Sequence, residues 1–123
     1  MADRIHILYI DDDPANQDSV SRALRRQGHI VHTARTGQEG ISMAENDRPD
    51  LILLDILLPD MTGFDVCEHL RSQARFKRIP IIGISASAID SDRRQSLSAG
   101  FDDYLAKPIP LFDLVNTIEQ FGL

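Results

Sequence analysis

Residues 49–63 read PDLILLDILLPDMTG, so that a single acid, Asp55, interrupts two apolar runs. Both runs are far too short to cross a membrane, which takes about 20 apolar residues in a helix. The stretch 51–54 is apolar at every position, as expected for a parallel strand that is covered on both faces. An acid beside such a strand needs a paired or hydrated site, because an ionised carboxylate is costly to bury alone. The stretch therefore predicts a buried strand with a functional carboxylate at its end.

The rest of the chain alternates short apolar runs with polar stretches of helical spacing, which is typical of α/β proteins with a parallel sheet. Besides 51–54, the residue types and spacing predict strands at 4–10, 29–33, 79–84 and 103–106.

Five helices are expected to follow these strands. Asp13 would cap the first helix, with Pro14 at its first position, and Gly28 would end it. Thr36 and Glu39 have the spacing of a capping box for the second. The remaining helices are predicted at 63–73 after Thr62, at 90–99, and from Pro110 onward, with a buried stripe made of Leu111, Leu114, Val115 and Ile118.

Strict alternation with right-handed crossovers favours one doubly wound sheet. We predict a flavodoxin-like (βα)5 fold with five parallel strands in the order 2-1-3-4-5 and helices on both faces. The length of 123 residues suits one domain, covering 1–123.

Composition narrows the functional classes. The net charge of −6 argues against direct nucleic-acid binding, which depends on Lys and Arg neutralising phosphates. Cys67 is the single cysteine, so an intramolecular disulfide and a cysteine-based zinc cage are excluded. The first residues have no apolar signal core behind them, so a cytoplasmic location is expected.

Charged and hydroxyl side chains follow the predicted strands. Asp11–Asp13 follow the first strand, Asp55 the third, Ser85 the fourth and Lys107 the fifth. In doubly wound sheets, ligands bind at the carboxyl ends of the strands. Two carboxylates about 4 Å apart repel by up to about 4 kcal/mol at an effective dielectric near 20. Mg²⁺, which prefers oxygen ligands and is shared with phosphate, would remove that repulsion, and Asp55 could then act as a nucleophile toward phosphorus.

On these residues the sequence resembles the receiver domains of two-component response regulators, over essentially its whole length. The matching stretches are ILYIDDDP (7–14), PDLILLDILLPDMTG (49–63), PIIGISA (80–86) and AGFDDYLAKP (99–108). Each alone is weak evidence, but in this order and at this spacing they are highly specific.

The resemblance implies that Asp55 accepts the phosphoryl group. Asp12 and Asp55 would bind Mg²⁺ directly, together with the backbone carbonyl of Leu57, and Asp11 would bind it through water. Mn²⁺ is expected to substitute for Mg²⁺.

The resemblance also assigns the residues around the phosphoryl group. Ser85 and Lys107 would hold its oxygens, and Ser85 and Tyr104 would form the switch. The family places a cis peptide bond before Pro108. Two positions that flank the path of a hydrolytic water are here Leu57 and Ser87, which favours slow loss of the phosphoryl group.

The expected partners are a histidine kinase or phosphotransfer protein as donor and a downstream protein as target. Phosphorylation would shift the surface of the fourth helix, fifth strand and fifth helix. We expect stoichiometric modification rather than enzymatic turnover, and a signal that leaves through protein contact.

Other interpretations of these residues remain. Asp11–Asp13 could simply cap a helix, Lys107 could be a solvated surface residue, and Ser85 could bond a loop. Asp11–Asp13 with Ser85 could also belong to a phosphatase of the haloacid dehalogenase type. In that family, however, the lysine precedes the final acidic pair, whereas Lys107 follows Asp102 and Asp103, and Asp55 would have no role. A pseudo-receiver scaffold would lack some of the acids and the lysine, which are all present.

Overall fold

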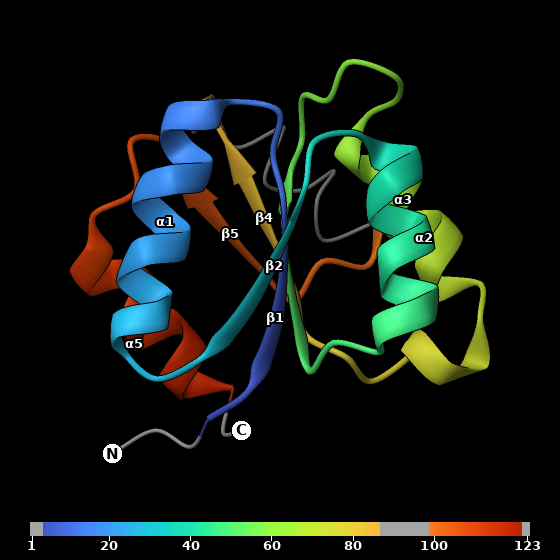
Figure 1. Cartoon of the computed structure of the whole chain (residues 1–123). Helices are drawn as coiled ribbons and strands as arrows, with labels where there is room; N and C mark the ends of the chain where they lie inside the picture. The colour runs from blue at the N-terminus through green and yellow to red at the C-terminus, as the bar shows by residue number, and fades with distance from the viewer. Residues whose placement is uncertain (1–3, 87–98, 122–123) are drawn as a thin grey trace.

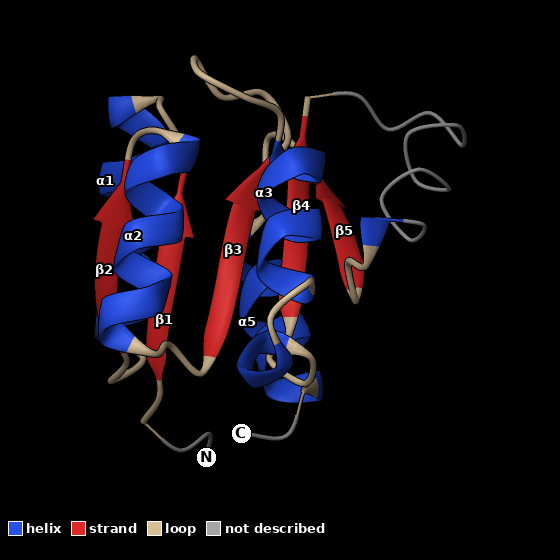
Figure 2. Ribbon diagram, turned by 90° about the vertical axis from the view of Figure 1, so that its right-hand side faces the viewer, coloured by secondary structure: helices blue, strands red, loops and turns tan. Residues whose placement is uncertain are grey.

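A parallel sheet of five strands forms the centre of the protein in the computed structural model, which describes residues 4–86 and 99–121 (Figure 1). The strand order is β2-β1-β3-β4-β5, so the predicted flavodoxin-like fold is confirmed. Figure 2 shows the strands side by side with their carboxyl ends at one edge. The strands are β1 (His6–Ile10), β2 (Ile30–Ala34), β3 (Leu51–Asp55), β4 (Ile81–Ser85) and β5 (Asp103–Ala106).

The predicted strand ends differ from the observed ones by at most two residues, and those of β5 agree fully. The difference matters in β3, which includes Asp55 as its last residue, and in β4, which includes Ser85. Asp55 is in register with Ile84 of β4, and Ser85 is in register with Ala106 of β5. Both polar residues are therefore held by the sheet itself rather than by a loop.

Helices cover both faces of the sheet, with α1 and α5 on one side and α2 and α3 on the other (Figure 1). A short 3-10 helix, η1 (Ala74–Phe76), follows α3. The predicted helix at 90–99 lies outside the described residues, apart from Ala99. In the part of the chain that the structure covers, no helix has the length and apolar character that crossing a membrane requires. The bounds are α1 (Pro14–Arg26), α2 (Gly37–Asp47), α3 (Gly63–Arg71) and α5 (Leu111–Gln120).

The helices begin where their capping residues predict. Asp13 accepts a hydrogen bond from the Ala15 amide at the start of α1, and Gly28 adopts a left-handed conformation, φ 93°, beyond the end of α1. Thr36 accepts from the amide of Glu39, which is one half of the predicted capping box. Both halves of a capping box form at the start of α3, between Thr62 and Asp65.

Two hydrophobic clusters lie on opposite faces of the sheet, because side chains alternate along a strand. Leu8 and Ile10 of β1 belong to the cluster under α2 and α3. Ile7 and Tyr9 belong to the cluster under α1 and α5. With both faces covered, β3 and β4 are buried along their whole length.

The predicted buried stripe of α5 is partly wrong. Leu114 and Ile118 are buried, but Leu111 is 47% exposed, and the neighbouring Phe112 is 75% exposed. Leu111 stands in the first turn of α5, where it lines an open groove beside Arg26 at the end of α1. Helical periodicity shows which residues share a face of a helix, but it does not show where the neighbouring helix that would cover this face ends.

Candidate functional site

Three side chains from different strands meet at the carboxyl edge of the sheet. The ammonium nitrogen of Lys107, just after β5, lies 2.8 Å from Oδ2 of Asp55 and 3.2 Å from Oδ2 of Asp11. The side chains of Asp11 and Asp55 are 0% and 5% exposed, whereas that of Lys107 is 20% exposed. The lysine is therefore paired with two buried carboxylates and is not a solvated surface residue.

Backbone contacts hold Lys107 in place. Its amide donates to the carbonyl of Ser85 at 2.7 Å, which continues the pairing of β4 and β5. The peptide bond between Lys107 and Pro108 is cis, as the family resemblance implies.

Asp11 is surrounded by donors. Its Oδ2 accepts a hydrogen bond of 2.6 Å from the Tyr9 hydroxyl, and its Oδ1 accepts from the Asp13 amide at 2.9 Å. Burial on its own would raise the pKa of Asp11, but the bonds from Tyr9 and Asp13 and the charge of Lys107 lower it below the usual value. Asp11 is therefore held as a carboxylate.

The pKa of Asp55 is shifted in the opposite direction from that of Asp11. Burial is the main cause that raises its pKa to about 6, and the negative charge of Asp11 adds to the rise, while Lys107 opposes it. The pKa of Lys107 is raised above its usual value: burial would lower it, but the bonds to Asp55 and Asp11 and their negative charges together outweigh that effect. Without a second cation, the site therefore carries an unfavourable concentration of negative charge.

The acids can hold a metal ion. Carboxylate oxygens of Asp11, Asp12 and Asp55 all lie within 4.8 Å of one another. Asp12 and Asp55 also line an open pocket of about 320 Å³, together with Leu57 and Lys107. Hard oxygen ligands beside open space suit Mg²⁺, which keeps several waters and binds few carboxylates. The predicted metal residues are thus brought together.

The predicted switch residues lie beside this site. Ser85 ends β4 and is 5% exposed, and Tyr104 in β5 is 6% exposed. The Tyr104 ring belongs to the cluster under α2 and α3, so it has an inward position in this structure. Ser87, the second predicted determinant of hydrolysis, lies outside the described residues.

The loop after Asp55 is tied down at several points. The Leu57 amide donates to Oδ1 of Asp55 at 3.2 Å, and the Gly63 amide donates to the carbonyl of Ile56 at 2.7 Å. The Leu57 side chain is 68% exposed at the pocket rim. A Cβ on Gly63 would meet the carbonyl oxygen of Asp55 at 2.4 Å, so α3 packs against the strand end as only glycine allows.

Two contacts were not predicted from the sequence. The first is the bond from Tyr9 to Asp11, although side chains two residues apart on a strand point to the same face. The second joins Asp60 to the start of α2, where its carboxylate accepts from the amides of Gly37 and Gln38. No sequence pattern indicates the second contact, because Asp60 is 23 residues from Gly37.

A family model described as the response regulator receiver domain matches residues 7–119. The chain belongs to this family. The assignment agrees with the geometry, because the acids and lysine that carry the resemblance meet at one edge of the sheet. The haloacid dehalogenase alternative is thereby set aside as a family assignment.

Curated relatives of this receiver domain differ in length. It is 33% identical to an uncharacterised 14.6 kDa protein of Leptolyngbya boryana over 98% of this chain and 92% of that protein. It is 42% identical to the transcriptional regulatory protein AfsQ1 of Streptomyces coelicolor over 84% of this chain, but spans only 44% of that regulator.

Solved structures share the fold over nearly the whole receiver domain. A putative response regulator of Chloroflexus aurantiacus superposes with a TM-score of 0.92 at 29% identity, covering 97% of this chain and 98% of that one. The receiver domain of the sensor histidine kinase PA1611 of Pseudomonas aeruginosa gives a TM-score of 0.89 at 34% identity, covering 97% of this chain and 98% of that one. That structure has a magnesium ion coordinated in its active-site cleft.

Proposed function

We propose that this receiver domain accepts a phosphoryl group on Asp55 from a histidine kinase or phosphotransfer protein. One observation carries the proposal: the Lys107 ammonium lies 2.8 Å from Asp55 at the point where three carboxylates converge. A lysine and a metal ion that face the carboxylates of one pocket supply what phosphoryl transfer needs, because the reaction depends on positioning and on neutralising negative charge.

In the proposed step, a carboxylate oxygen of Asp55 attacks the phosphorus of a phosphohistidine. The new oxygen–phosphorus bond forms an acyl phosphate, the phosphorus–nitrogen bond breaks, and the donor imidazole takes a proton as it leaves. Lys107 and the Ser85 hydroxyl would then hold phosphoryl oxygens. Asp12, Asp55 and the Leu57 carbonyl would hold Mg²⁺, with Asp11 acting through a water. The ion would neutralise phosphoryl charge, and Mn²⁺ should replace it because it accepts the same oxygen ligands.

The proposed response is a shift between two conformations. A hydrogen bond from Ser85 to the phosphoryl group would favour the inward position of Tyr104, and this would bias the surface formed by β5, α5 and the segment before β5. A protein target that binds one form of this surface would receive the signal. We also propose that this receiver domain does not itself bind nucleic acid, because its net charge is −6. One relative is named a DNA-binding regulator, RpaA of Synechocystis, and the chain spans 45% of it.

The test uses acetyl phosphate as donor and intact mass as the measurement. With Mg²⁺ the protein should gain one phosphoryl group, and without a divalent cation it should gain little. Asp55→Asn should abolish the gain, while Asp113→Asn, an exposed acid on α5, should not change it. Equal labelling of Asp55→Asn and the parent would refute the assignment. Sustained turnover of a phosphate ester would favour an enzymatic function instead.

A further inference from the structure

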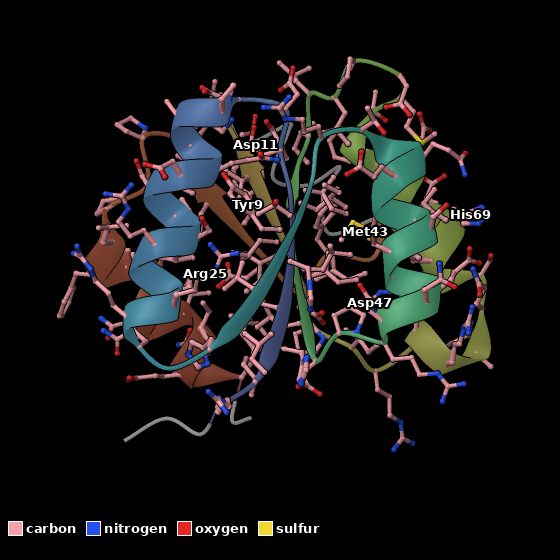
Figure 3. All side chains as sticks on the ribbon, in the orientation of Figure 1. Tyr9, Asp11, Arg25, Met43, Asp47 and His69 are labelled. Carbon is pink, nitrogen blue, oxygen red and sulfur yellow. The ribbon has the colours of Figure 1, made fainter. Side chains whose placement is uncertain are left out.

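Tyr9 lies directly beneath the proposed phosphoacceptor site. It is fully buried in β1, two residues before Asp11, and the two side chains therefore share a face of the sheet. Figure 3 shows both residues close together near the carboxyl end of β1. The Tyr9 hydroxyl donates to Oδ2 of Asp11 at 2.6 Å, so a core residue contacts the acid at its buried side.

The oxygen that Tyr9 contacts is also the one that faces Lys107. The lysine nitrogen lies 3.2 Å from this Oδ2 and 2.8 Å from Oδ2 of Asp55. Asp11 and Asp55 thus compete for one ammonium group. The Tyr9 hydroxyl supplies Asp11 with a second donor, which reduces the charge that the lysine has to balance there.

We propose that Tyr9 is a positioning residue for phosphoryl transfer: by donating to Oδ2 of Asp11, it directs Lys107 toward Asp55. The inference rests on the proposed function of Asp55. Tyr9 does not touch the phosphoryl group and acts through Asp11. Without the hydroxyl, Lys107 becomes the one remaining donor to this oxygen among the described residues, and it is drawn away from Asp55.

The test is Tyr9→Phe, which keeps the ring that packs in the cluster under α1 and α5 and removes the hydroxyl alone. The rate of labelling by acetyl phosphate at saturating Mg²⁺ should fall about tenfold, the lower end for losing a hydrogen bond to a charged group. The Mg²⁺ concentration for half-maximal labelling should change by less than about threefold, because the direct ligands are intact. Ser21→Ala is the matched control, since it removes another buried hydroxyl, which bonds the backbone within α1.

A double-mutant cycle shows whether Tyr9 acts through Asp11. In an Asp11→Ala background, Tyr9→Phe should have no further effect on the labelling rate. Equal rates for Tyr9→Phe and the parent would overturn the inference, as would a full tenfold loss in the Asp11→Ala background. Failure of the parent to label would instead refute the phosphoacceptor assignment.

A measurement on the unmodified protein covers the case in which the variant does not fold. The Tyr9 hydroxyl proton should exchange slowly, and its NMR resonance should move when Mg²⁺ and beryllofluoride are added, because Lys107 then leaves Asp11 for the phosphoryl mimic. A resonance that stays in place while Asp55 binds the mimic would overturn the inference.

Discussion

The ammonium nitrogen of Lys107 lies 2.8 Å from Oδ2 of Asp55, although the two residues are 52 positions apart. Asp55 ends β3 and Lys107 follows β5, and β4 lies between these strands. The lysine therefore reaches across the end of β4, where its amide is fixed to the carbonyl of Ser85. This places Ser85, the proposed switch residue, between the lysine and the acid along the edge of the sheet.

Asp55→Asn should change how stability depends on pH. The pKa of Asp55 is raised from 3.8 to about 6, so the folded protein binds a proton that the unfolded chain has lost. As the pH rises from about 4 to about 6, the free energy of unfolding of the metal-free parent should therefore fall by about 1–3 kcal/mol. This fall should be missing in the variant, and Mg²⁺ at pH 7.5 should stabilise the parent more than the variant. Urea unfolding with EDTA or Mg²⁺ measures both effects, and parallel pH curves for the two proteins would contradict the account.

Ser85→Ala should leave labelling of Asp55 within about threefold of the parent, because Lys107 and the acids that would hold the charge-neutralising metal ion are unchanged. The conformational response should weaken, since in the proposed mechanism the hydroxyl couples the phosphoryl group to the rest of the sheet. Amide chemical shifts in β5 and α5 on addition of beryllofluoride provide the measurement. A response as large as that of the parent would rule out Ser85 as the coupling residue.

The phosphorylated protein should lose its phosphoryl group slowly. The exposed Leu57 side chain at the pocket rim is apolar and cannot hold a hydrolytic water, and Ser87 carries no charge to activate one. The double variant Leu57→Asn, Ser87→Glu should therefore decay faster, by about tenfold or more. Loss of phosphoryl from the two purified proteins in Mg²⁺ gives the comparison, and equal decay would show that other residues determine the lifetime.

Gly63→Ala should damage the site as well as the fold. A Cβ there would meet the carbonyl of Asp55 at 2.4 Å and the Cα of Ile56 at 2.9 Å, both in the backbone. The free energy of unfolding should fall by about 1–3 kcal/mol, and labelling of Asp55 should slow because the strand end moves. Gly28→Ala is the control: its left-handed φ of 93° makes it costly, but a Cβ there meets nothing within 4 Å. If both variants label like the parent, α3 does not position Asp55.

The helix ends and strand pattern were predictable because their causes are local. Asp13 caps α1 through the amide of Ala15, two residues away, and Gly28 ends the same helix through its own φ. The burial of Leu111 was predicted wrongly because it depends on how far α1 extends alongside α5, which is a matter of packing between distant segments.

The sequence by itself determined that acids and a lysine follow strands at the same edge of one sheet, because strand order and direction follow from the alternation of elements and from right-handed crossovers. That was enough to predict Asp11, Asp12, Asp55 and Lys107 as one site. Only the tertiary structure decided how their charges are shared: Lys107 bonds two acids, and Tyr9 supplies Asp11 with a further donor. These pairings depend on distances of a few ångströms between separate strands. Burial and the charge of Asp11 raise the pKa of Asp55 although Lys107 opposes the rise, whereas the bond from Tyr9 and the charge of Lys107 lower the pKa of Asp11.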